Sequence, residues 1–490
     1  MSSVFGGEDW GGFGEKVRQR EDCFLLIALN YRKSFFKLTI VELPIKFVIL
    51  QNILKYEVMI VDFSVGNFKS IKDIQTLSMT AAPIVSNPKY EDVDKNNVFK
   101  VNDKLSLLKS KAVYGANASG KSNLVKGLTT FISVVNESVK DEIILNKQIE
   151  PFKLSTSTEK KPSYFQLSFF VEGVYYRYGF EATNNEIVSE WLFGTPGKKE
   201  VPFFTRSGMK IQVNKNAFIE GNKISGLYIK KGNDIARKNS LFLTALKSFG
   251  GKISTKLVDY ISSIIIVSSD HSEYMRAQAL DSLNDETIKN QIVSFLNIAD
   301  TGIENIQKFE FSREDLPNDA PKDLIENLEK AKKIGLVITA HKKFNGKLKE
   351  LGNVPFELTL HESGGTLKMF GLSHFIIQAM NENRPLIIDE FDASFHPLLS
   401  KKLVELFNSD INKGQSQFIF ITHDTNLLSP KLLRRDQICF VEKDKYGASH
   451  VYTLVDFKGI RNDASFEKDY INGRYGAIPF LGDFDSIFEK

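Results

Sequence analysis

Short apolar runs separated by turn residues predict a series of β-strands in the first half of the chain. The segment from Met59 to Val65 has the pattern of a strand. Similar patterns cover residues 164–170 and 174–180, on either side of the turn-forming pair Glu172-Gly173, and continue over residues 186–193 and 203–213. These segments predict an antiparallel meander rich in aromatic residues. Such an aromatic stripe is more typical of a sheet core than of a base-stacking platform.

The pattern becomes mostly helical from about residue 233 to residue 336, as in residues 240–246 and 287–296. The charged run over residues 323–333 also predicts a helix, but it is too short for a long coiled coil. We therefore expect four segments: an N-terminal extension that need not belong to the core (1–58), an N-terminal lobe (59–232), a mainly helical insertion (233–345) and a C-terminal lobe (346–490).

Composition narrows the class of protein without identifying it. The 490 residues carry a formal net charge of +4, which is too small to argue for nucleic acid by itself. The two cysteines, Cys23 and Cys439, form no paired motif, which fits a reducing compartment. Charged and amide side chains interrupt the most apolar run, residues 45–61, and the N-terminus lacks a signal-peptide profile. We expect a cytoplasmic protein without a membrane span.

The most informative stretch is Gly115–Ser122, GANASGKS, which fits the phosphate-binding pattern G-x-x-x-x-G-K-[ST]. It follows an apolar strand and precedes a helical pattern, the context in which glycines let backbone N–H groups surround a phosphate. Lys121 can then reach the β- and γ-phosphates, and the Ser122 hydroxyl can ligate Mg²⁺. A chance match on a glycine-rich turn is the alternative. The candidate nucleotide contacts are Gly115, Asn117, Ser119, Gly120, Lys121, Ser122 and Asn123.

Two further strands end in side chains suited to hydrolysis. The apolar run 385–388 ends in Asp389 and Glu390, which suggests an outer support for Mg²⁺ and a carboxylate that polarises the attacking water. The run 418–422 ends at His423, a candidate sensor of the γ-phosphate, since ligands bind at the carboxyl ends of parallel strands. An acidic pair at a strand end and a structural histidine remain the plainer interpretations.

A third motif, Glu362-Ser363-Gly364-Gly365-Thr366, precedes a long apolar helical pattern. Small residues at a helix start expose backbone N–H groups and can bind an anion. An ordinary helix cap would also explain it. Its place about twenty-five residues before the acidic strand is the order expected of a phosphate-contacting motif in one class of ATPase.

Together, the segments GANASGKS, ESGGT, LIIDEFDASFHP and FIFITHD resemble the ATP-binding cassette (ABC) ATPases, in the branch of SMC-like, RecF-like and OLD-family proteins. Two C-terminal segments, Arg461–Lys468 and Gly473–Pro479, more narrowly resemble a bacterial AAA-family ATPase group of abortive-infection and restriction loci, the RloA-like and AbiL-like proteins. The resemblance implies an α/β fold, namely an ABC-type P-loop NTPase head with an antiparallel β meander in its N-terminal lobe and a helical insertion.

The resemblance also implies a head-to-tail dimer with two Mg-ATP molecules between the subunits. In that arrangement Lys121 and Ser122 bind phosphate and metal, Asp389 holds the metal, Glu390 is the general base and His423 is the switch. The resemblance further implies nucleotide contacts across the interface from Asp392, Ser363, Gly364 and Gly365. This chain has ESGGT where transporters favour LSGGQ, and no residue is assigned to the glutamine that links metal to the helical lobe.

The leading functional hypothesis is an ATP-driven switch of a bacterial phage-defence system that controls a separate effector of the nuclease or toxin type. A DNA-repair ATPase of the RecF or SMC type is the main alternative, and nucleic acid stays open as a partner. A transporter subunit fits poorly, because roughly 240 residues separate the loop from the glycine motif. An OLD-type protein with its own nuclease is also disfavoured, because only 67 residues follow His423.

Overall fold

The computed structural model divides the chain into two compact units. The larger unit comprises Ile53–Asp270 and Gln378–Lys490, and the smaller one Met1–Asn52 and His271–Ile377. The structure describes residues 58–228, 237–268, 272–312, 334–393, 395–461, 464–479, 482–484 and 487–488. The predicted extension over residues 1–58, Val58 apart, and the predicted charged helix over residues 323–333 lie outside the described residues.

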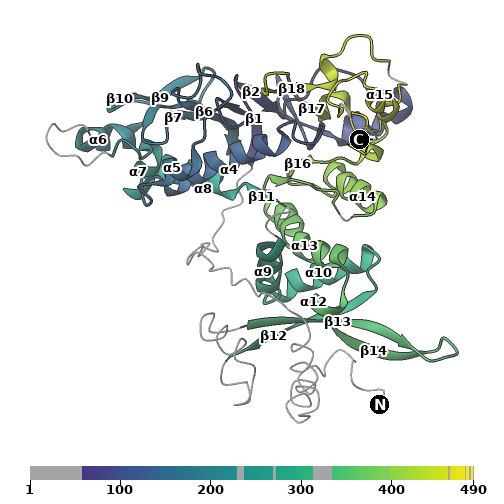
Figure 1. Ribbon diagram of the computed structural model, residues 1–490. Coiled ribbons are helices and arrows are strands. Elements are labelled where there is room, and N and C mark those ends of the chain that lie inside the picture. The colour runs from purple at the N-terminus through teal and green to yellow at the C-terminus, as the bar shows by residue number, and fades with distance from the viewer. Residues whose placement is uncertain are drawn as a thin grey trace. The chain divides into compact units, whose positions relative to one another are not determined.

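A seven-stranded antiparallel sheet forms one part of the larger unit, with strand order β10-β9-β8-β7-β6-β1-β2 (Figure 1). Its strands are β1 (Val58–Gly66), β2 (Gln75–Ser78), β6 (Ser163–Val171), β7 (Val174–Ala182), β8 (Ile187–Thr195), β9 (Val201–Ser207) and β10 (Lys210–Val213). Consecutive strands from β6 to β10 pair with their neighbours, and the predicted Glu172-Gly173 turn joins the first two. The predicted meander is therefore confirmed.

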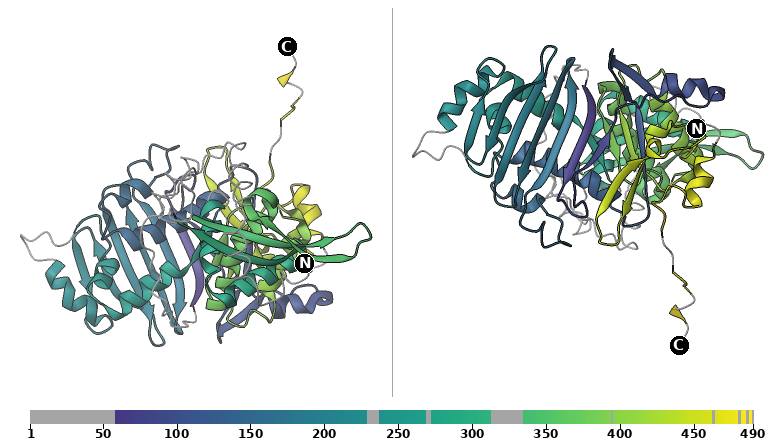
Figure 2. Two further views of the ribbon diagram at one scale, coloured as in Figure 1. Left: turned by 90° about the horizontal axis from the view of Figure 1, so that it is seen from below. Right: turned by 90° about the horizontal axis from the view of Figure 1, so that it is seen from above.

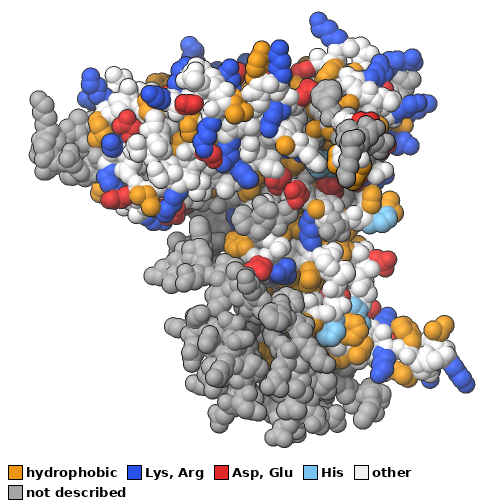
Figure 3. All heavy atoms as spheres, viewed as in Figure 1, with side chains coloured by type: hydrophobic (Ala, Val, Ile, Leu, Met, Phe, Trp, Pro, Cys, Tyr) orange, Lys and Arg blue, Asp and Glu red, His pale blue; other side chains and the backbone are white. Residues whose placement is uncertain are grey.

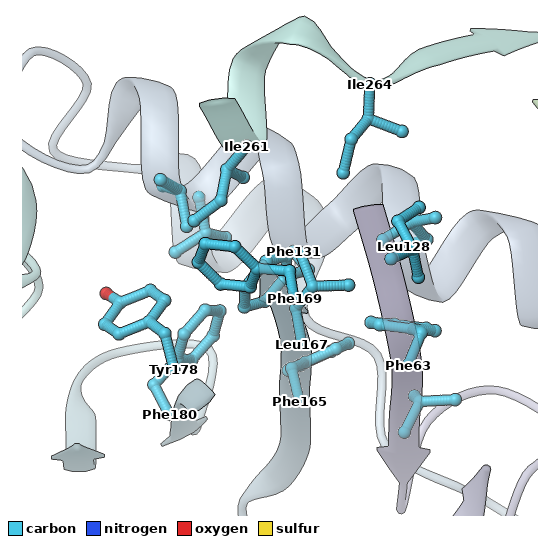
Figure 4. Packing of buried hydrophobic residues seen from close by; sticks show 14 of the residues in the cluster. Phe63, Leu128, Phe131, Phe165, Leu167, Phe169, Tyr178, Phe180, Ile261 and Ile264 are labelled. Atoms are coloured by element: carbon cyan, nitrogen blue, oxygen red, sulfur yellow. The ribbon is translucent and has the colours of Figure 1, made fainter. Parts of the chain in front are cut away.

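Helices cover one face of this sheet and form the main hydrophobic core with it. They are α4 (Lys121–Glu137), α5 (Ile144–Gln148), α6 (Ile219–Tyr228), α7 (Phe242–Ser248) and α8 (Lys252–Ser263). Alternate strand residues such as Phe165 and Phe180 point toward the helices, and the rings of Phe131 and Phe180 stack with centroids 5.6 Å apart (Figure 4). The inward-facing aromatic residues are thus core, as the pattern predicts.

A six-stranded sheet of order β11-β15-β16-β5-β17-β18 forms the other part of the larger unit. Its strands are β5 (Ser110–Tyr114), β11 (Ile265–Val267), β15 (Leu386–Ile388), β16 (Phe418–Ile421), β17 (Ile438–Lys443) and β18 (Ser449–Thr453). All are parallel to their neighbours except β18. The carboxyl ends of β5, β15 and β16 therefore meet at one edge of the sheet, where ligands bind in folds of this kind.

Short elements complete the larger unit, and Figure 2 shows them from two further sides. They are α3 (Glu91–Asn96), β3 (Val98–Asn102), β4 (Leu105–Leu108), α14 (Pro397–Asn408), α15 (Phe466–Ile471) and the 3-10 turns Pro88–Tyr90, Thr425–Leu427, Arg435–Gln437 and Leu454–Asp456. Among the residues that the structure describes, no helix is both long and apolar enough to cross a lipid bilayer.

The smaller unit combines helices with a three-stranded antiparallel sheet. It contains α9 (Ser272–Ser282), α10 (Glu286–Ile298), β12 (Ile303–Phe311), β13 (Ile334–Phe344), β14 (Glu350–Glu357), α12 (Leu358–His361) and α13 (Gly364–Glu382), the last of which runs past the unit boundary. Most of the described residues between 242 and 298 are helical as expected, the short strand β11 apart, but residues 303–311 and 334–344 form strands. Strand β13 is stabilised by pairing with β12 and β14 on its two sides. The local sequence pattern predicted a helix there because it does not reveal such pairing with other strands.

Candidate nucleotide-binding site

The loop between β5 and α4 has a backbone that only glycine permits at two positions. Gly115 has a φ angle of +155°, and a Cβ there would lie 2.3 Å from the Val441 carbonyl oxygen. Gly120 has a φ angle of +109°, and a Cβ there would lie 2.2 Å from Ser449 Oγ. Helix α4 begins directly afterwards, and no side chain caps its N-terminus. Its first N–H groups are thus available to an anion.

Lys121 bends back over this loop. Its ammonium donates hydrogen bonds of 2.9 Å to the carbonyl oxygens of Gly115 and Ala116. Burial lowers the pKa of Lys121, while Asp389, Asp392 and Glu390 act in the opposite direction. The ammonium therefore lies where the loop and the acidic strand ends meet.

Two serine hydroxyls outside the loop stabilise it through hydrogen bonds, and neither serine was predicted from the sequence to have this role. Ser449 Oγ, at the start of β18, donates to the Ser119 carbonyl oxygen over 2.6 Å and lies 2.8 Å from Ser70 Oγ. The amide of Asn123 donates to the same Ser70 oxygen over 2.7 Å. Asn123, predicted as a nucleotide contact, thus supports the loop in this structure. No local sequence pattern distinguishes either serine, because the partners of each lie far away in the chain.

The other loop residues differ in exposure. Asn117 is exposed, whereas Ser119 is buried and its hydroxyl has no hydrogen-bond partner among the described residues. An unpartnered buried hydroxyl is costly unless a ligand pairs with it. Together with the crowded positions of Gly115 and Gly120, it indicates a loop built around a bound anion.

Asp389 at the end of β15 is 7% exposed, and burial raises the pKa of its carboxyl. The nearby Ser122 side chain of the loop acts in the opposite direction on that pKa. The next residue, Glu390, is exposed and adopts a left-handed φ of +53°, which is unfavourable for a side chain larger than glycine. Its N–H donates to Asp389 Oδ1 over 3.1 Å.

His423 follows β16 at the same edge. Its backbone N–H donates to Asp392 Oδ1 over 3.2 Å, which joins the segment after β15 to the segment after β16. Partial burial lowers the pKa of His423, and the positive charge of Lys121 lowers it further. The structure thus brings Lys121, Ser122, Asp389, Asp392 and His423 together at one sheet edge.

The glycine-rich motif lies in the smaller unit, at the start of α13. Ser363 Oγ accepts a hydrogen bond of 3.1 Å from Thr366 N, and both Ser363 and Gly364 are exposed. Glu362 accepts hydrogen bonds of 2.6 Å from His341 Nε2 and from Thr339 Oγ1, both on β13. The glutamate that distinguishes this motif therefore attaches it to the neighbouring sheet.

The C-terminal segment Gly473–Pro479 forms a packed turn against β17 and β18. Tyr452 donates to the Tyr475 carbonyl oxygen over 2.8 Å, and the ring of Tyr475 lies 5.9 Å from that of Phe440. Helix α15 reaches the segment after His423, because Glu467 accepts a 2.8 Å hydrogen bond from Thr425. Of the neighbouring Arg461–Lys468 segment, Asn462 and Asp463 lie outside the described residues.

The residues fit ATP with a magnesium ion. Mg²⁺ in such sites takes a hydroxyl, one or two carboxylates and phosphate oxygens, and Ser122 at the start of α4 and Asp389 directly after β15 offer the first two at one sheet edge. Within the described ranges, no group of three or more His, Cys, Asp or Glu side chains could hold a metal by itself. The nucleotide would therefore supply the remaining ligands.

The fold and this loop define the chain as a P-loop nucleoside triphosphatase of the α/β class. A family model described as "AAA domain, putative AbiEii toxin, Type IV TA system" matches residues 112–429, which include the loop, the glycine-rich motif and both strand-end motifs. The chain belongs to this AAA ATPase family. No curated protein sequence matches it.

Among solved structures, the chain is similar to heads of SMC proteins. The SMC head domain from Thermotoga maritima aligns at 13% identity and a TM-score of 0.38, over 80% of this chain and 98% of that one. An SMC head bound to the C-terminal winged-helix domain of ScpA aligns at 14% identity and a TM-score of 0.40, over 80% and 97% of the two chains. The Pyrococcus furiosus SMC head with an extended coiled coil aligns at 13% identity and a TM-score of 0.35, over 85% and 99%.

Proposed function

We propose that this chain binds Mg-ATP, hydrolyses it slowly and uses the cycle as a conformational switch. The observation that carries the proposal is that the phosphate-binding loop follows β5 and Asp389 follows β15 at the same edge of one parallel sheet. This arrangement joins the phosphate-binding and metal-binding halves of a P-loop site, beside an ammonium that can reach a terminal phosphate.

Each residue at this edge has a distinct task in the proposed reaction. Lys121 exchanges its two loop carbonyls for phosphate oxygens and stabilises the charge that develops on them. Ser122 and Asp389 would hold Mg²⁺, whose charge neutralises the phosphates when it is bound. Glu390 accepts a proton from the attacking water, and the neutral His423 side chain senses the γ-phosphate.

A second copy of the chain would complete the site. Ser363, Gly364 and Gly365 begin α13, where exposed N–H groups can meet the γ-phosphate held by the partner copy. Asp392 would take part in the same interface. The active species is then an ATP-bound homodimer with two composite sites.

The family description, which names a putative AbiEii toxin and a Type IV TA system, supports a role in phage defence. We infer that the ATP-dependent dimer controls a separate effector protein of the nuclease or toxin type. A DNA-repair ATPase of the RecF or SMC type is the rival function. The two functions predict different partners for the dimer, namely an effector protein for the first and nucleic acid for the rival.

The test compares Glu390→Gln and Lys121→Ala proteins by gel filtration and by phosphate release with Mg-ATP. Glu390→Gln should bind ATP, release little phosphate and elute as a dimer, because binding is intact and the proton acceptor is lost. Lys121→Ala should show neither ATP binding nor dimerisation.

Two variants serve as matched controls. Lys126→Ala removes the same charge from an exposed position on α4, and Glu186→Gln makes the same substitution at an exposed turn residue. Hydrolysis retained by Lys121→Ala, or a Glu390→Gln protein that stays monomeric at saturating ATP, would contradict the mechanism. A trapped dimer that carries nucleic acid and no protein from its host lysate would favour the rival function.

A further inference from the structure

Strands β13 and β14 form a hairpin whose end projects from the smaller unit (Figure 1). Every residue from Lys342 to Gly352 is exposed except Asn345, which is half-buried. Asn345 holds the turn together, since its Oδ1 accepts 2.9 Å hydrogen bonds from the N–H groups of Lys347 and Lys349. The tip is thus an ordered two-stranded ribbon with solvent on its sides.

Positive charge is concentrated at this tip. Residues 342–351 contain four lysines and one glutamate, a net charge of +3 (4 − 1), whereas the whole chain carries only +4. Lys342 lies 3.6 Å from Glu304 and 3.9 Å from Glu350. Among the described residues, Lys343, Lys347 and Lys349 have no carboxylate partner. Unpaired lysines on a projecting element attract a polyanion.

Apolar side chains alternate with these lysines. Phe344 is 51% exposed, Leu348 83% and Leu351 54%. Figure 3 shows basic and hydrophobic side chains together over the end of this hairpin. Exposing three large apolar side chains to water is unfavourable. Their exposure on one charged turn therefore indicates a surface that is covered when a partner binds.

We propose that residues 342–351 form an arm that binds double-stranded DNA. A two-stranded ribbon fits the major groove of B-form DNA, whereas the deep, narrow major groove of A-form RNA excludes side chains. Lys343, Lys347 and Lys349 contact phosphates along the groove, and Leu348 at the tip contacts the thymine methyl groups and sugars. Binding is largely independent of sequence, because its charged contacts are to the backbone.

The arm is connected to the glycine-rich motif within the same unit. Strand β13 carries His341 and Thr339, which hold Glu362 immediately before Ser363. DNA on the arm would therefore act on the motif that, in the proposed function, touches ATP. This regulatory consequence rests on the proposed function, whereas DNA binding itself does not.

The experiment measures binding of a fluorescent 30-base-pair duplex by anisotropy over a series of salt concentrations. The variant combines Lys343→Ala, Lys347→Ala and Lys349→Ala. The control combines Lys198→Ala, Lys199→Ala and Lys210→Ala, which remove the same charge from exposed positions of the larger unit. All proteins also carry Lys121→Ala, so that the result does not depend on ATP binding or hydrolysis.

The arm variant should bind on the order of tenfold more weakly, and its slope of log K against log[salt] should fall by about 0.9 for each phosphate that the arm no longer neutralises. The control should bind as the parent does. Leu348→Ser should weaken binding without changing the slope, because it removes no charge. Equal thermal unfolding temperatures would show that the exposed substitutions leave the fold intact.

Two results would overturn the proposal. One is an arm variant with the affinity and salt slope of the control. The other is a parent protein that binds vesicles of anionic phosphatidylserine through the same lysines but does not bind the duplex, since the arm would then be a membrane contact. Failure of ATP-dependent dimerisation would not affect the measured DNA affinity or its salt dependence. It would count only against the proposed ATP-driven switch.

Discussion

At the scale of single residues, the nucleotide site consists of charged groups that alter one another's protonation. Lys121 lies among three carboxylates, and its positive charge acts on the His423 imidazole. Burial opposes the charged form of Lys121 and of His423 alike. The neutral imidazole is thus favoured at physiological pH. Its protonation can change when a bound phosphate draws the Lys121 ammonium away.

We expect His423 to titrate below the ordinary imidazole range, because burial and the neighbouring ammonium both penalise its protonated form. Lys121→Ala should raise the pKa of His423, since it removes the positive neighbour. NMR titration of the histidine resonances measures this, with His423→Gln used to assign the signal. The matched Lys126→Ala variant should leave the titration unchanged. A pKa of His423 that does not respond to Lys121→Ala would contradict the proposed proximity of charge.

Among the elements of the fold, one helix is capped at its N-terminus by a side chain from a strand that is distant in the sequence. Glu190 on β8 accepts hydrogen bonds from Phe242 N over 2.7 Å and from Leu243 N over 3.0 Å, the first N–H groups of α7. Tyr178 donates to the same carboxylate, and Arg206 lies 3.4 Å from it. The carboxylate therefore caps α7 and joins it to the sheet.

Glu190→Ala should lower the free energy of unfolding by about 3–5 kcal/mol, because it leaves the buried Arg206 guanidinium without its counter-charge and two helix N–H groups without their acceptor. Glu190→Gln should cost less, since the amide oxygen still accepts from the helix. Denaturant unfolding followed by circular dichroism measures both. Glu186→Ala, on an exposed turn of the same meander, should change stability by less than about 0.5 kcal/mol. Equal stabilities of Glu190→Ala and the parent would refute the capping role.

At the scale of the whole molecule, the predicted site residues are divided between the two compact units. The phosphate-binding loop and both strand-end motifs belong to the larger unit, and Ser363, Gly364 and Gly365 belong to the smaller one. Each copy would then supply one half of each composite site in the proposed dimer. This division makes the mechanism testable by complementation.

Lys121→Ala and Gly364→Trp chains should each be inactive alone, the first without ATP binding and the second because its bulky side chain blocks the exposed helix start. Mixed in equal amounts, the two chains can form heterodimers in which one of the two sites is intact, so phosphate release should recover to at most about half of the wild-type rate. A mixture of Lys121→Ala and Glu390→Gln chains is the control, because no heterodimer of these has an intact site. Failure to recover activity would argue against the head-to-tail arrangement.

Features that arise from contiguous residues could be predicted from the sequence. The two glycines and the Lys-Ser pair fix the shape and chemistry of the loop, because φ angles and side-chain types are local properties. Continuous apolar runs ending in Asp389 and His423 predicted buried strands with polar carboxyl ends. Parallel pairing then brings the two strand ends to one edge, as the order of motifs implied.

Features that depend on residues distant in the chain became apparent only in the folded protein. Ser449 supports the loop from 330 residues away, and Glu190 caps a helix 52 residues further on. Three lysines of the β13–β14 tip, Lys343, Lys347 and Lys349, form no ion pair in the described part of the chain, which only the structure reveals. Such partnerships arise from strand register and packing between elements, so no local pattern of residue types encodes them.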